Sequence, residues 1–160
     1  MKIVSVKATA AIALFVSAAA HSGIAVGHGV NGSLGEKASA TDVYQVTCSD
    51  EEGSTTPSYR LLASVRDNKP KRRPLVSVWT IKDGTTTKAA DTNGDGNRRY
   101  SAETHNENGS GVYVMKVTKS NKLRKFRRGK ENYSVEFHCE GPPSSGFIHT
   151  GTDIIRTQNQ

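Results

Sequence analysis

The sequence predicts an all-β protein, an antiparallel β-sandwich of jelly-roll or immunoglobulin-like type with about seven or eight short strands. Three observations predict this class. Apolar and polar residues alternate in several short runs, as a strand with one buried face requires. Turn residues separate these runs, and no run outside the N-terminus has a helical period.

Residues 131–139 form the clearest predicted strand. Tyr133, Val135 and Phe137 alternate with polar residues, and the run ends at Cys139. The run 42–48 ends in the other cysteine, Cys48. Because two cysteines in an exported chain indicate one disulfide, we predict a Cys48–Cys139 bond, with two separate buried thiols as the alternative.

The N-terminus predicts an export signal. Lys2 and Lys7 precede and flank an apolar run too short to cross a membrane, and small residues follow at 18–20. We expect a signal peptide at 1–20, with cleavage as late as residue 27 because 25–27 form a second small-residue site. The mature chain then starts at His21 or His28, with a flexible lead segment at 21–40 and one domain at 41–160. No later run is long enough for a transmembrane helix, so the expected location is secreted or periplasmic.

The remaining elements follow in chain order. Alternation predicts a strand at 59–66, and prolines with a charge run predict a loop at 67–74. The β-prone run 75–81 is a strand that ends in a turn at 82–84, and 89–99 is a Gly- and Asn-rich loop. We expect further strands at 100–104 and 112–117, and short edge strands at 147–149 and 153–155.

Four segments together carry a family resemblance: 41–44, the valine-rich run 75–81, 111–117 and 133–135. Over about residues 40–139 the chain resembles the bacterial pre-peptidase C-terminal domain. The resemblance implies a small, non-catalytic jelly-roll-like sandwich of the kind appended to secreted peptidases, some of which bind matrix proteins, polysaccharides or calcium. Lys71 to Pro74 stand where members often carry aspartates, a departure that weighs against a calcium site of the family type.

A second calcium hypothesis comes from the loop after residue 90. Asp91, Asn93 and Asp95 place oxygen ligands at alternate positions beside glycines, as in the first half of an EF-hand loop. Ala102 occupies the position of the acidic twelfth ligand. The alternative is a plain Asn/Gly turn.

Histidines suggest a copper site. A terminal histidine, His21 or His28, offers its α-amine and imidazole together, a chelate that suits Cu(II). A further imidazole from His105, His138 or His149 would complete a tetragonal site. The alternative is that these histidines are merely exposed.

Two basic loops suggest a polyanion. The formal charge is +7, including the two lysines of the signal, and basic residues gather at 69–73 and 122–130. The loops hold one aromatic residue, Phe126, so we expect no nucleic-acid stacking platform and no sequence-specific nucleic acid. The alternative is that the charges keep loops soluble and protect strand edges. The candidates are Lys71, Arg72, Arg73, Arg124, Lys125, Arg127 and Arg128.

No catalytic motif is present among the residue spacings. We therefore expect a non-catalytic binding or adhesion protein that recognises an anionic polysaccharide or another cell-envelope component. One alternative is a periplasmic copper-binding protein that uses its terminal histidine. Another is a subunit of an extracellular assembly, in which the segment before Ala40 adds as a strand to a neighbour.

Overall fold

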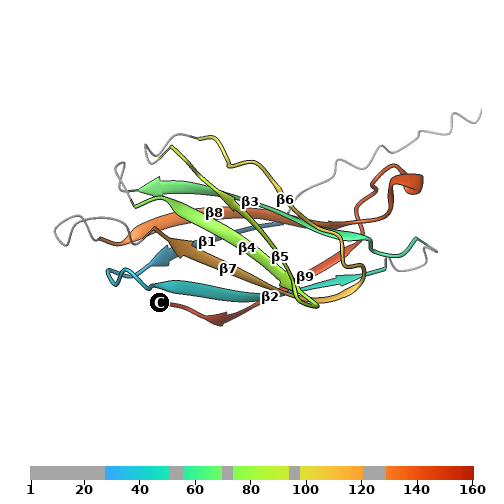
Figure 1. Ribbon diagram of the computed structural model, residues 1–160, viewed down its shortest axis with the longest axis horizontal. Coiled ribbons are helices and arrows are strands. Elements are labelled where there is room, and N and C mark those ends of the chain that lie inside the picture. Colours follow the sequence, from blue (N-terminus) through green and yellow to red (C-terminus); the bar gives the residue numbers. More distant parts are fainter. Residues whose placement is uncertain (1–27, 51–55, 70–73, 94–97, 121–128) are drawn as a thin grey trace, which may run out of the picture.

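The computed structural model describes residues 28–50, 56–69, 74–93, 98–120 and 129–160. These residues form two antiparallel sheets packed face to face (Figure 1), which confirms the predicted β-sandwich. Within the described ranges no helix is long and apolar enough to cross a membrane. The strands are β1 (His28–Leu34), β2 (Thr41–Ser49), β3 (Arg60–Lys69), β4 (Val76–Lys82), β5 (Thr85–Ala90), β6 (Thr104–Asn106), β7 (Gly111–Lys119), β8 (Glu131–Glu140) and β9 (Gly151–Gln158).

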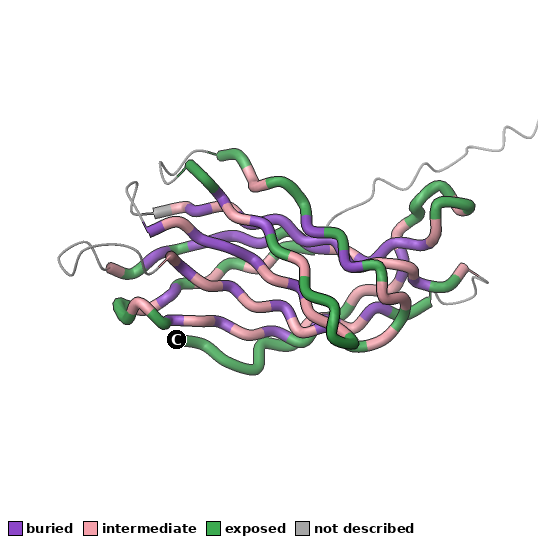
Figure 2. Tube along the Cα trace, in the orientation of Figure 1, coloured by how far each residue is buried: buried purple, intermediate pink, exposed green. Residues whose placement is uncertain are grey.

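The sheets have the orders β1-β8-β3-β6 and β5-β4-β7-β2-β9. Alternate residues of each central strand point into the space between the sheets, which gives the banded burial pattern of Figure 2. In β8 the inward residues are Tyr133, Val135, Phe137 and Cys139, each at most 1% exposed. The residues between them face outward, so β8 presents a second, separate surface.

A disulfide joins the two sheets. Cys48 of β2 and Cys139 of β8 are bonded, with Cα atoms 5.5 Å apart and a sequence separation of 91. The predicted bond is therefore confirmed. The two strands are not neighbours in a sheet, because β2 pairs with β7 and β9 while β8 pairs with β1 and β3.

Strand β1 replaces part of the expected flexible lead segment. Residues 28–34 pair with β8 in continuous antiparallel register, from His28 opposite Phe137 to Leu34 opposite Glu131. The run lacks the apolar alternation that is typical of a strand, because one of its positions is Gly32, which lies directly over the buried Tyr133. A Cβ at this position would lie 2.2 Å from the hydroxyl of Tyr133, so only glycine fits. Residues 28–34 therefore belong to the sandwich, although the sequence placed the start of the domain at 41.

Other boundaries differ in smaller ways. The predicted turn after β4 is present, with Asp83 and Gly84 both at positive φ (49° and 80°), as a two-residue hairpin requires. It leads into β5, which the sequence did not predict because three threonines and a lysine carry no apolar alternation. The short strand expected at 100–104 lies at Thr104–Asn106. The expected edge strand at 153–155 falls inside β9, whereas 147–149 contributes only a single bridge, from His149 to Glu140.

A group of buried ionisable side chains lies where β8 begins. Glu131 is fully buried, and neither of its carboxylate oxygens has a hydrogen-bond partner among the described residues. Burial, together with a smaller effect of nearby Asp67, raises the pKa of Glu131 to about 8 against the opposing effect of Lys119. Burial also lowers the pKa of Lys119, whose Nζ donates to the carbonyl oxygens of Gly35 and Gly129. The folded protein therefore favours a protonated Glu131.

We expect the disulfide to supply a large part of the stability. Closing a loop of 91 residues restricts the unfolded chain by about 4 to 5 kcal/mol in the chain-entropy model. The Cys48→Ala/Cys139→Ala variant should lose about that much unfolding free energy in urea titration, and thiol reduction of the native protein should cause a similar loss. Equal urea midpoints for the oxidised protein and the variant would contradict this role.

Glu131 should make stability depend on pH. Its pKa is about 8 in the folded protein against an ordinary value of 4.5, so its contribution to stability is fully present below pH 4.5 and is lost as the pH rises through 8. Glu131→Gln, which keeps the shape but cannot ionise, should unfold with a flatter pH profile and gain stability relative to the native protein near pH 9. The matched control is Glu103→Gln, at an exposed glutamate. If Glu131→Gln retains the native profile in urea titrations from pH 5 to 9, the assignment is wrong.

Candidate metal centre

The outward face of β8 carries two potential metal ligands at its end. Because Cys139 points into the core, His138 and Glu140 on either side of it point to the opposite face. Neither side chain is freely solvated: His138 is 17% exposed and Glu140 10%. The strand pleat therefore places an imidazole and a carboxylate side by side in a partly shielded position.

His149 reaches the same face from the segment that follows β8. After Gly141 the chain makes a 3-10 turn at Pro143–Ser145 and returns antiparallel to the end of β8. The return is fixed by backbone hydrogen bonds from Gly141 N to Ile148 O (2.8 Å) and from Thr150 N to Cys139 O (2.9 Å). His149 lies opposite Glu140 in this bridge, and paired residues share a face.

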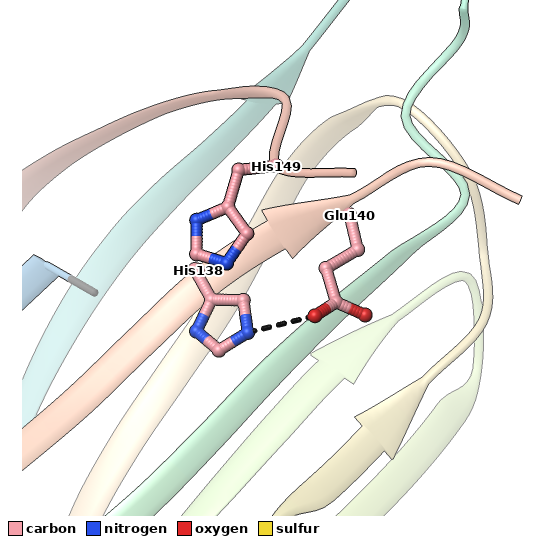
Figure 3. Close-up of side chains that lie close together, drawn as sticks. All are labelled: His138, Glu140 and His149. Atoms are coloured by element: carbon pink, nitrogen blue, oxygen red, sulfur yellow. Dashed lines mark hydrogen bonds and ion pairs between the residues drawn. The ribbon is translucent and has the colours of Figure 1, made fainter. Parts of the chain in front are cut away.

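The three side chains converge (Figure 3). His138 Nε2 lies 2.9 Å from Glu140 Oε1, and the rings of His138 and His149 stack with centroids 4.3 Å apart and planes 9° apart. One ligand atom from each residue can be chosen so that all three lie within 4.8 Å of one another. Among the described residues, this is the group of three or more His, Cys, Asp or Glu side chains close enough to hold an ion.

Arg60 of β3 holds the carboxylate and the returning segment. Its Nε and one terminal nitrogen donate to Glu140 Oε2 at 2.9 and 2.7 Å, and its guanidinium lies 3.9 Å from the ring centroid of Phe147. Such charge-assisted bonds fix a carboxylate more firmly than neutral ones do. Oε1 of Glu140 is left to face the histidines.

Burial makes His149 a better ligand. Desolvation lowers the pKa of His149, the neighbouring His138 lowers it further, Glu140 opposes these effects, and His28 adds a smaller lowering. A lowered pKa keeps the imidazole neutral, and the neutral ring is the form that binds metal.

Two imidazole nitrogens and a carboxylate oxygen suit a divalent transition metal. Imidazole binds Zn²⁺ at about 2.0–2.1 Å, so two ligand atoms of a tetrahedral site lie ~3.3 Å apart. The observed limit of 4.8 Å means that the groups must approach one another slightly and the stacked rings must turn until their lone pairs meet at one point. Since both rings are at the surface end of the sandwich, such a rotation leaves the core untouched.

A small acidic pocket adjoins the centre. Its volume is about 210 Å³, and His138 and His149 line it together with Glu103 and Glu136. The two extra carboxylates make this side of the centre attractive to cations. The remaining lining residues are Leu62, Ala63 and Ser64.

The other predicted copper ligands are placed differently. His105 of β6 lies opposite Leu62, which also lies opposite His138, so β3 separates the two histidines. The exposed His105 instead has its Nε2 3.7 Å from Glu103 Oε2 and its Nδ1 3.4 Å from a terminal nitrogen of Arg60. His28 is the first residue of β1, with its ring 5.9 Å from that of Phe137. His21 lies outside the described residues.

The predicted calcium loop is only partly described. Asp91 is buried, and its two oxygens accept backbone hydrogen bonds from Asp67 N (2.9 Å) and Asn93 N (3.0 Å). This carboxylate therefore has a structural task in capping the turn. Asn93 is exposed and Asp95 lies outside the described residues, so calcium binding stays a prediction.

All the polyanion candidates lie outside the described residues, in the ranges 70–73 and 121–128. Polyanion binding and strand addition to a neighbouring subunit therefore stay predictions. The export signal at 1–20 has the same status.

No protein-family model, curated protein or solved structure matches this chain. The resemblance to the pre-peptidase C-terminal domain consequently stays a prediction. Sequence reasoning named His138 and His149 but missed Glu140. Glu140 could have been predicted from the sequence, because it stands two residues after His138 and residues two apart in a strand share a face.

Proposed function

We propose that this protein binds a divalent transition-metal ion through His138 and His149, with Glu140 as the third group of the site. The observation that carries the proposal is the convergence of these three side chains from two separate segments, with ligand atoms within 4.8 Å. The proposed role is binding of the ion rather than catalysis.

The ligand types decide the class of metal. Calcium and magnesium prefer oxygen ligands, whereas two imidazoles favour copper, zinc or nickel. Among divalent ions of the first transition row, copper binds such ligands most tightly. We therefore place Cu²⁺ first and Zn²⁺ second.

The surroundings support a site that stays assembled without metal. Arg60 fixes Glu140, and Glu140 in turn accepts a hydrogen bond from His138 when that ring carries its proton on Nε2. Carboxylates that orient a ligating imidazole in this way raise metal affinity. Apo and metal-bound forms should consequently share one backbone arrangement.

The disulfide supports the expected compartment. A Cys48–Cys139 bond persists where thiols are oxidised, as in the periplasm or outside the cell. We propose that the protein binds its metal there, after export under the predicted signal.

Removal of one imidazole should weaken the site selectively. With the exported protein stripped of metal by chelator, His149→Ala should bind Cu²⁺ and Zn²⁺ at least about tenfold more weakly in calorimetric titration, because a direct ligand is lost. His105→Asn is the matched control, since it removes an exposed imidazole of the same sheet, keeps a hydrogen-bond acceptor for Arg60, which lies 3.4 Å from His105 Nδ1, and should leave affinity unchanged. Equal affinity of His149→Ala and the native protein, or loss in the control alone, would overturn the proposed site.

A further inference from the structure

Two segments distant in sequence share one edge of β8. Strand β3 pairs with the opposite edge of β8, where Ala63 lies opposite Phe137 and Arg60 lies opposite Glu140. The two segments divide the remaining edge between them. Strand β1 occupies it from His28, opposite Phe137, onward, and the returning segment occupies it at His149, opposite Glu140.

The break between these segments lies at His138. Thr150 N donates to Cys139 O, after which Gly151 leaves for the other sheet, where it lies opposite Ser49. Among the described residues, none pairs with His138 on this edge. His28 of β1 pairs with Phe137, the residue before His138, so the backbone nitrogen of His28 lies on the side of the pair toward His138.

The sequence before His28 offers a cleavage site at the same point. Ala25, Val26 and Gly27 are the small residues that a signal peptidase accepts. Hydrolysis of the Gly27–His28 bond by water leaves the carboxylate on Gly27 and a primary amine on His28. A peptide nitrogen is a poor ligand near neutral pH, whereas a terminal amine, with a pKa of about 7.7–8.0, gives up its proton to a metal readily.

From this arrangement we propose that cleavage before His28 completes a copper site, in which the new α-amine of His28 joins the imidazoles of His138 and His149 on Cu²⁺. This inference rests on the metal site proposed above. The His28 ring lies 5.9 Å from the ring of Phe137, on the opposite face of the sheet from His138, so the amine rather than the ring is the proposed ligand. Amine and imidazole nitrogens together give the tetragonal environment that Cu²⁺ prefers over the tetrahedral one of Zn²⁺.

Such a site couples metal binding to export. Before cleavage the chain offers only the two imidazoles and Glu140, and after cleavage it offers a further nitrogen beside them. Glu103 and Glu136 in the adjoining pocket attract the cation in both forms. Tight copper binding is therefore confined to the processed protein.

The test compares two exported proteins. One is the native chain, and the other carries a Gly-Pro dipeptide inserted before His28, which moves the amine away while the proline removes a backbone N–H that an extension could offer to copper. Intact mass should show the native protein starting at His28. In competition titration the inserted form should bind Cu²⁺ at least about tenfold more weakly, and its copper EPR spectrum should change, while Zn²⁺ affinity changes less.

Each outcome separates this inference from the metal site itself. Equal Cu²⁺ affinity and equal spectra of the two forms, at equal urea midpoints, would overturn the role of the amine, as would a native mass starting at another residue. His149→Ala made in the inserted form tests the site without the amine. If it binds like the inserted form alone, the metal site proposed above fails; if it binds more weakly, that site stands whatever the role of His28.

Discussion

The bond between Cys48 and Cys139 is the interaction on which the arrangement depends. It ties β8 to the opposite sheet at the residue between His138 and Glu140. With Cys139 held inward, the pleat forces both neighbours outward. The same bond therefore closes the core and sets the orientation of two of the three proposed metal-site residues. Arg60 then secures Glu140 from the neighbouring strand, and the backbone bonds of Gly141 and Thr150 bring His149 back to it.

The sequence predicted those elements in which burial of one face dictates the pattern. β2, β4, β7 and β8 bury alternate residues and were recognisable, as was the disulfide. β1 was not recognisable, because its Gly32 is needed to make room for Tyr133 of the paired strand β8, and such a contact leaves no periodic pattern in the sequence. β5 is an edge strand with exposed threonines, and nothing in its composition distinguishes it from a loop.

The sequence allowed individual residues of the candidate site to be predicted, but not that they lie together. The polar face of β8 follows from alternation, which covers His138 and Glu140. The position of His149 depends on a turn with two left-handed residues, Gly146 and Phe147, and the second is unusual for a bulky side chain. The place of His28 beside His138 depends on strand register, which long-range packing decides. The distant segments become neighbours only in the folded chain.

The most direct measurement is a crystal structure of the copper-loaded protein with anomalous scattering recorded at the copper edge. The account predicts one anomalous peak on the outer face of β8, about 2.0–2.1 Å from an imidazole nitrogen of His138 and from one of His149. A peak at other residues, or none after loading at stoichiometric copper, would contradict the central claim that these histidines form a metal centre.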